Sequence, residues 1–275
     1  MVGNVFSPYY ARARRRGAGD PFDHCALNVA LYGPGGKRWT LTERGRDSLD
    51  RSATAITIGP SSVEWDGDAL TVRIDEVTVP LPSRVRGLVR VRPTALVGRT
   101  FALDAAGTHR WRPIAPCARV EVELERPALR WSGAAYLDSN SGDAPLEDAF
   151  VRWDWSRAGD DRSTTVLYDV ARRSGDELSL ALRFGADGAM QVIEPPPPIS
   201  LPHTLWRVPR GTRADAAAHA TVLRTLEDTP FYARSVLSTR VHGATMHAVH
   251  ESLSLDRFRS RWVQALLPFR MPRIA

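Results

Sequence analysis

The stretch that best indicates the fold is residues 131–156, WSGAAYLDSNSGDAPLEDAFVRWDWS. Two strand-like arms flank a middle rich in Ser, Asn, Gly and Pro. Residues two apart in a strand share a face, so Tyr136 and Asp138 point the same way, and so do Trp153 and Trp155. The pattern predicts an antiparallel hairpin. Its acids either form a solvated turn beside an aromatic core or place a carboxyl group against aromatic walls, where it can act on an apolar substrate.

The rest of the chain repeats this pattern of short alternating runs separated by turn residues, which is typical of an antiparallel sandwich or barrel. Residues 2–10 are interpreted as the end of a strand, residues 214–228 as a short helix or irregular crossing, and residues 256–267 as a C-terminal helix. The runs expected to be strands cover residues 25–33, 38–45, 62–82, 85–93, 119–127, 163–173, 178–185 and 189–194.

A domain junction is predicted near Ala115. Pro113 and Pro116 interrupt the alternation, and a new long strand is expected to start at Arg119, because proline cannot donate to a sheet ladder. The chain therefore divides into an N-terminal β domain, residues 1–115, and a C-terminal β domain, 116–275, which includes the C-terminal helix.

Composition is that of a globular protein, with 43% hydrophobic and 25% charged residues among 275. The net charge is +6, but Lys37 is the only lysine and the arginines are spread along the chain. This spread does not favour a nucleic-acid partner, whereas a peripheral contact with an anionic membrane surface would suit it. The candidate contacts, which are otherwise solvated loops, are Arg12, Arg14, Arg15 and Arg16, and Arg257, Arg259 and Arg261.

Cofactor and metal motifs are missing from the sequence. It contains no GxGxxG, Walker, GxSxG, HExxH or EF-hand pattern. Cys25 and Cys117 form no CxxC pair, which favours a reducing, cytoplasmic compartment. No apolar run reaches the roughly 18 residues of a membrane span, so any membrane contact is expected to be peripheral.

Five long segments resemble the carotenoid 1,2-hydratase family, also called hydroxyneurosporene synthases, of purple photosynthetic bacteria. Together they run over nearly the whole chain. Family members usually continue upstream of the strand expected at Val2, so the first sheet is expected to lack an edge strand. The segments are FSPYYARARRRG, DPFDHCALNVALYGPGGKRWTLTERGR, WRPIAP, RPALRWSGAAYLDSNSGDAPLEDAF and RWDWSRA.

The resemblance implies two lipocalin-like β-barrel or sandwich domains and a cofactor-independent hydro-lyase. It implies addition of water to the terminal C1=C2 bond of an acyclic carotenoid such as neurosporene or lycopene, giving a tertiary alcohol at C1. The family's catalytic residues match His109, Trp111, Tyr136 and Asp138. Each of these has an ordinary structural interpretation by spacing alone, as junction core, loop or turn residue.

The chemistry agrees with these residue types. An Asp kept protonated by an apolar environment can protonate C2, and the faces of Trp111 and Tyr136 can stabilise the tertiary cation at C1. His109 or the returned Asp138 carboxylate can accept the proton of the attacking water. Asp154 is the rival acid, expected to face away from its flanking tryptophans. The alternatives are a lipocalin-like carrier of long apolar ligands without chemistry, and a basic nucleic-acid-binding β protein.

Overall fold

The computed structural model describes residues 1–275 except 34, 161, 217–219 and 275. Its contacts divide the chain into two compact units, each assembled from separate segments. Unit 1 comprises residues 1–92, 119–133 and 264–275, and unit 2 comprises residues 93–118 and 134–263. Large antiparallel sheets dominate both units, so the all-β prediction is confirmed.

Unit 1 is built on an antiparallel meander that follows chain order from β4 to β8 and continues into residues 119–126 of β10 and 129–133 of β11. The expected hairpin of residues 25–45 is present as β1 and β2. The elements of unit 1 are α1 (Pro8–Arg15), η1 (Pro21–Asp23), β1 (Asn28–Leu31), β2 (Arg38–Leu41), β3 (Glu43–Arg44), η2 (Arg46–Ser48), β4 (Leu49–Arg51), β5 (Ala55–Ile58), β6 (Ser61–Trp65), β7 (Leu70–Val77), β8 (Arg84–Pro93), η4 (Leu267–Phe269) and β21 (Arg273–Ile274).

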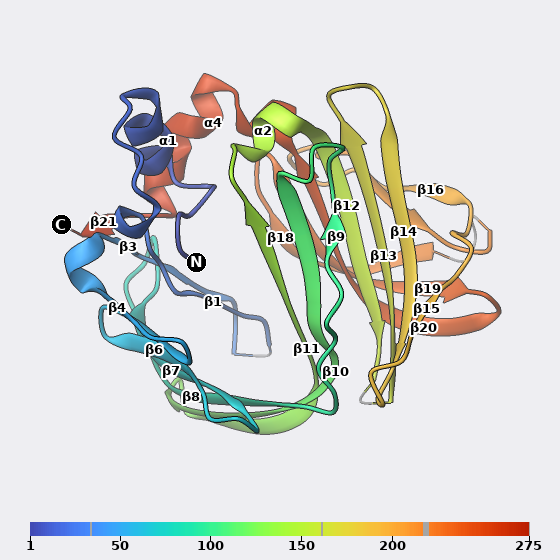
Figure 1. The fold of residues 1–275 in the computed structure, drawn as a ribbon, viewed down its shortest axis with the longest axis horizontal. Helices are drawn as coiled ribbons and strands as arrows, with labels where there is room; N and C mark the ends of the chain where they lie inside the picture. The colour runs from blue at the N-terminus through green and yellow to red at the C-terminus, as the bar shows by residue number, and fades with distance from the viewer. Residues whose placement is uncertain (34, 161, 217–219, 275) are drawn as a thin grey trace. The chain divides into compact units, whose positions relative to one another are not determined.

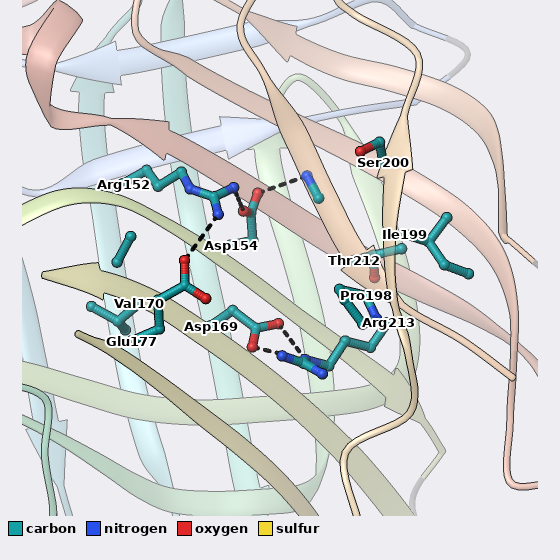
Figure 2. Close-up of a pocket in the computed structure, with 12 residues that line it drawn as sticks. Arg152, Asp154, Asp169, Val170, Glu177, Pro198, Ile199, Ser200, Thr212 and Arg213 are labelled. Carbon is teal, nitrogen blue, oxygen red and sulfur yellow. Dashed lines mark hydrogen bonds and ion pairs between the residues drawn. The ribbon is translucent and has the colours of Figure 1, made fainter. Parts of the chain in front are cut away.

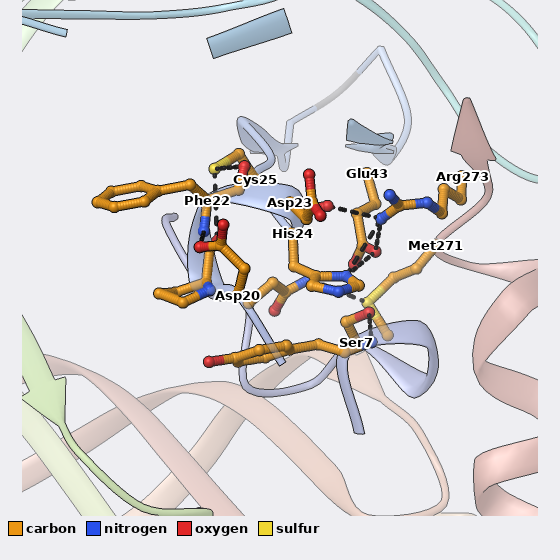
Figure 3. Close-up of polar contacts among 12 residues, drawn as sticks. Ser7, Asp20, Phe22, Asp23, His24, Cys25, Glu43, Met271 and Arg273 are labelled. Carbon is orange, nitrogen blue, oxygen red and sulfur yellow. Dashed lines mark hydrogen bonds and ion pairs between the residues drawn. The ribbon is translucent and has the colours of Figure 1, made fainter. Parts of the chain in front are cut away.

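A buried polar cluster joins the two ends of the chain within unit 1 (Figure 3). The fully buried carboxylate of Glu43 lies 2.8 Å from His24 Nδ1 and accepts a hydrogen bond from Arg273 at 2.7 Å. Strand β21 runs parallel to β3 and pairs Arg273 with Glu43. A buried charge needs such partners, so this cluster fixes the C-terminal strand to the N-terminal segment.

Unit 2 centres on a seven-stranded antiparallel sheet in the order β15-β14-β13-β12-β20-β19-β18, visible as the yellow-green to orange strands of Figure 1. The remaining elements are β9 (Phe101–Ala102), β10 (His109–Arg126), β11 (Leu129–Gly142), α2 (Leu146–Ala149), β12 (Phe150–Gly159), β13 (Ser163–Arg172), β14 (Glu177–Gly185), β15 (Met190–Val192), β16 (Pro198–Leu201), β17 (Arg210–Arg213), β18 (Ala220–Asp228), β19 (Tyr232–Val241), β20 (Ala244–Ser254), α3 (Leu255–Phe258) and α4 (Arg261–Leu266).

The two faces of this sheet have different roles. On one face, Ala158, Leu237 and Ala248 form an apolar cluster with Leu201 of β16, and β17 contacts β12, β13 and β20. The opposite face presents aromatic residues of β12 and β13 toward Tyr136 of β11 and Trp111 of β10 in the same unit. The alternation along β12 assigns neighbouring residues to these two environments.

Several element predictions were wrong. Residues 8–10, predicted to belong to a strand over 2–10, instead begin helix α1. Ser7 caps this helix by accepting from the backbone N–H of Tyr10, and Pro8 occupies its first turn. Residues 220–228 are strand β18, whose neighbour β19 supplies its hydrogen bonds. His219 and its two predecessors lie outside the described residues.

The predicted interruption at Pro113 and Pro116 is also wrong, because both prolines lie inside the single 18-residue strand β10. Proline is compatible with a strand at positions whose N–H is not required by the ladder. The domain boundary at residues 115/116 stays a prediction. In the structure, the contacts group residues 93–118 with unit 2. The C-terminal helix is present, split into α3 and α4.

Candidate functional site

Three of the four predicted site residues meet at one carboxyl group. Asp138 Oδ2 accepts a hydrogen bond from Trp111 Nε1 at 2.7 Å and another from the Tyr136 hydroxyl at 3.1 Å. Tyr136 and Asp138 share a face of β11, and Trp111, fully buried, comes from β10. Both donors select the same oxygen, so Oδ1 is the atom on which the acid would carry its proton.

Aromatic rings surround this carboxyl group. The Trp111 ring lies 5.4 Å from Phe101 and meets the edge of Tyr168 at 5.6 Å between centroids. Tyr136 lies 5.5 Å from Trp155 of β12. Such rings offer negative faces to a cation and little competition as nucleophiles. The arrangement therefore suits an acid that generates a carbocation.

The surroundings of Asp138 raise its pKa, which favours the protonated acid. Burial raises the pKa of Asp138, the hydrogen bonds from Trp111 and Tyr136 oppose that rise, and the negative charge of Glu251 adds to it, while Arg157 lowers it. The guanidinium of Arg157 lies 5.4 Å from the centroid of the Tyr136 ring. Burial also raises the pKa of Tyr136 well above its ordinary value, so this residue is a neutral donor.

Glu251 enters the site from β20. The strand register places it opposite Trp155 of β12 and opposite Arg234 of β19. Arg234 forms an ion pair with Glu251 Oε1 at 2.7 Å. Neighbours directly opposite in an antiparallel pair share a face, so Glu251 lies on the aromatic face of the sheet.

His109 lies near these residues in sequence but is engaged elsewhere. Its buried ring is 3.4 Å from Asp104 through Nδ1 and 3.0 Å from the Ala144 carbonyl oxygen through Nε2. The ring also packs edge-on against Phe150 at 4.9 Å. Gly142 approaches so closely that a Cβ there would lie 2.6 Å from His109 Cδ2. The ring is therefore held in place, with both nitrogens in polar contacts.

The rival acid, Asp154, lies on the opposite face of β12, as expected. It lines a pocket of about 240 Å³ together with Arg152, Asp169 and Arg213 (Figure 2). Asp154 Oδ1 accepts hydrogen bonds from the Gly211 backbone N–H at 3.0 Å and from the Ser252 hydroxyl. Burial raises the pKa of Asp154 to about 6. Five of the twelve residues that line this pocket are charged, among them the ion pair of Asp169 with Arg213, in contrast to the aromatic surroundings of Asp138.

Four residues of the aromatic face were not assigned to the site from sequence. Arg157, Tyr168 and Glu251 carry no local motif. Trp155 was predicted only to share a strand face with Trp153. The signal that could have found them is strand pairing, because β12 aligns Trp155 with both Tyr168 and Glu251.

The fold and the site together define an all-β protein with a partly buried acid set among aromatic side chains. The family model for the carotenoid hydratase CrtC matches residues 1–275. The acyclic carotenoid 1,2-hydratase of Thiocapsa roseopersicina is 61% identical over the whole chain and 68% of its own length, and that of Rubrivivax gelatinosus is 52% identical with the same coverage. The Rhodobacter capsulatus relative is 37% identical, with 97% of its length covered.

The chain belongs to the carotenoid hydratase family and is thereby an enzyme, a hydratase. The fold has its own support from a crystal structure described as an AttH protein of Nitrosomonas europaea. It aligns with a TM-score of 0.59 at 14% identity, over 83% of this chain and 80% of that one. Among the described residues no helix is long and apolar enough to cross a membrane.

Proposed function

We propose that the protein hydrates the terminal C1=C2 bond of an acyclic carotenoid, such as neurosporene or lycopene, with Asp138 as the acid. The observation that carries the proposal is the pair of hydrogen bonds from Trp111 and Tyr136 to one oxygen of that carboxyl group. Membership of the hydratase family and relatives named acyclic carotenoid 1,2-hydratase support the reaction class. The acid, its partners and the order of steps are our assignment.

The first step moves a proton from Asp138 Oδ1 to C2. The π electrons form the new C–H bond, and C1 becomes a tertiary cation. A carboxylic acid is a weak donor to carbon, so the step requires that the charge left on Asp138 be stabilised as it forms. Trp111 and Tyr136 already donate to Oδ2 and need no reorganisation at that moment, which is how preorganised donors lower a barrier.

The cation at C1 is held by ring faces. Tyr136, which donates to the acid, and Trp155 beside it are partly exposed, and a desolvated cation over such a ring gains about 2 kcal/mol. The ring carbons stabilise the cation without forming a bond to it, whereas an oxygen lone pair would add to C1. Water is then the nucleophile that reacts.

Water attacks C1, forming the C–O bond, and the oxonium loses a proton to the Asp138 carboxylate, which regenerates the acid. No electrons are gained or lost overall. We assign His109 a positioning role, because both of its ring nitrogens already contact Asp104 and Ala144. The ring then supports the segment between β11 and α2 rather than taking the proton.

We further propose that the protein binds peripherally to the cytoplasmic face of the membrane. A long polyene partitions into the bilayer, so the enzyme must meet it there. The net charge of +6 suits an anionic surface.

The decisive experiment incubates the purified protein with lycopene or neurosporene in ¹⁸O-labelled water. The label is expected in the C1 hydroxyl of the product. Asp138→Asn removes the acidic proton at similar volume and keeps one oxygen that can accept from Trp111 and Tyr136. Its activity should fall by at least a thousandfold, a loss expected for a group that acts in the chemical step.

Asp143→Asn is the matched control, because Asp143 follows in the same segment with its side chain 80% exposed. This variant should keep wild-type activity. Label missing from the product, or full activity in Asp138→Asn, would refute the mechanism. Tight carotenoid binding by the wild type without any product would instead identify a carrier.

A further inference from the structure

Unit 2 carries an exposed apolar surface. Leu205 is 97% exposed, Trp206 46% and Trp262 50%. The two tryptophan rings stack on each other, with centroids 6.0 Å apart and planes 26° from parallel. Single exposed apolar residues are ordinary, but a contiguous aromatic group of this kind marks a binding surface.

The turn that carries Leu205 is rigidly anchored although its side chain points outward. Asp228 Oδ2 accepts hydrogen bonds from the backbone N–H groups of Leu205 at 2.8 Å and Trp206 at 3.3 Å. Arg257 of α3 donates to the Trp206 carbonyl oxygen and to that of Pro230. These hydrogen bonds fix a turn whose Leu205 side chain stands in solvent.

The backbone conformation at the end of this turn also indicates that the turn is held in one conformation. Arg207 has a φ of +55°, a left-handed conformation that costs about 1–3 kcal/mol in a residue other than glycine. The Thr204 hydroxyl accepts from Val208 N–H at 3.1 Å, which helps to hold the turn closed. Such an arrangement persists only where surrounding contacts determine it.

Positive charge surrounds the apolar group. Arg207, Arg259 and Arg261 are exposed, and among the residues that the structure describes no ion pair is formed by any of the three. The nearest acid in sequence, Asp256, is already bound to Arg173 at 2.8 Å. The surface therefore combines aromatic and aliphatic side chains with unneutralised guanidinium groups.

We infer that this surface, Leu205, Trp206 and Trp262 with Arg207, Arg259 and Arg261, docks on an anionic phospholipid bilayer. Tryptophan is favoured at the level of lipid headgroups because its ring is apolar and its N–H is polar. The guanidinium groups match lipid phosphates. Leu205, at the tip, would enter the acyl region. This inference rests on the proposed peripheral membrane contact and assigns it to one surface.

The test is flotation with vesicles of phosphatidylcholine, with and without phosphatidylglycerol. The wild type should bind only the anionic vesicles. Leu205→Ser/Trp206→Ser should weaken binding about a hundredfold, and Arg259→Gln/Arg261→Gln about 30-fold. Brominated lipids should quench tryptophan fluorescence in the wild type and less in Trp206→Ser/Trp262→Ser.

Two controls match these variants. Trp131→Ser removes an equally exposed tryptophan, 46%, outside the turn. Arg15→Gln/Arg16→Gln removes two charges from α1, the rival basic cluster. Both should bind as the wild type does. Hydration of detergent-solubilised substrate should be unchanged in every variant, since none touches the site of Asp138.

Each other outcome overturns part of the assignment. Wild-type protein that ignores anionic vesicles refutes membrane contact itself. Binding that survives Leu205→Ser/Trp206→Ser, or that is lost equally in Arg15→Gln/Arg16→Gln, refutes this surface while leaving membrane contact standing. A wild-type dimer that the tryptophan variants convert to monomer, without effect on vesicles, would identify a second copy of the chain as the occupant.

Discussion

Replacing Trp111 with phenylalanine tests the assignment of Asp138 most directly. The change removes the N–H that donates to Asp138 Oδ2 at 2.7 Å and keeps an aromatic ring in a fully buried position. That N–H stabilises the carboxylate more than the neutral acid. Its loss therefore raises the pKa of Asp138 further above the ordinary value than burial already does.

The expected effect on rate follows from the sign of that change. Asp138 must be protonated to act, so the rate falls as pH rises through its pKa. In Trp111→Phe this falling limb moves to higher pH. A hydrogen bond to a charged acceptor is worth about 1.5–3 kcal/mol, and 1.36 kcal/mol corresponds to a factor of ten. At a pH above the limb, the protonated fraction should increase by about ten- to a hundredfold. The low-pH plateau should fall because the acid is weaker.

The assay is the rate of hydroxylated product formation across a pH series, with each variant normalised to its own plateau. Tyr136→Phe is the internal comparison. Its hydroxyl donates to the same oxygen at the longer distance of 3.1 Å, so the limb should move in the same direction by less. A limb that stays in place in Trp111→Phe, or moves to lower pH, would refute Asp138 as the titrating acid.

Three further predictions follow from other contacts. Glu251→Gln should move the falling limb to lower pH, because the negative charge of Glu251 raises the pKa of Asp138; an upward move would contradict this. Burial raises the pKa of Asp154 to about 6, so the wild type loses unfolding free energy as pH rises from 3.8 to about 6 and Asp154→Asn does not. In urea unfolding the variant should therefore gain up to about 3 kcal/mol relative to the wild type over this range. A difference in unfolding free energy that does not change with pH would contradict this. Gly142→Ala should lose about 1–3 kcal/mol of unfolding free energy and lower the melting temperature, because its Cβ would meet His109 at 2.6 Å; an unchanged melting temperature would show that the ring can move aside.

Many of the strands could be predicted from the sequence, because the alternation of side chains along a strand is a local pattern. Alternation at β1–β2 and β12–β13 is visible in the sequence and survives in the structure. The first helix was missed because its signal is a cap, Ser7 followed by Pro8, and not an apolar stripe. The interruption assigned to Pro113 failed because proline excludes a hydrogen bond at one position and does not end a long strand whose other residues remain paired.

The candidate site was predictable only as far as spacing within one strand reaches. Tyr136 and Asp138 share a face of β11 by alternation alone, and the hydrogen bond between them agrees with that prediction. The proximity of Trp111 to Asp138 depends on how β10 and β11 align, and the place of Glu251 depends on its pairing with Trp155, 96 residues earlier in the chain. Such alignments are settled by packing over the whole sheet, which no short motif encodes.

Asp138 and Asp154, whose pKa values are both raised, show why a raised pKa does not identify a catalytic group by itself. The pKa of Asp154 is raised to about 6, yet this residue lies on the face of β12 that β17 covers. Its carboxyl group accepts hydrogen bonds from the Gly211 backbone of β17 and the Ser252 hydroxyl of β20. Each acid accepts its two donors on a single oxygen, but the donors to Asp138 are the side chains of two aromatic residues, Trp111 and Tyr136. A register shift of one residue in β12 would exchange the faces of Asp154 and Trp155, removing a ring from the site and placing a second acid there. The proposed chemistry therefore depends on register, which the apolar cluster of Ala158, Leu237 and Ala248 on the opposite face helps to fix.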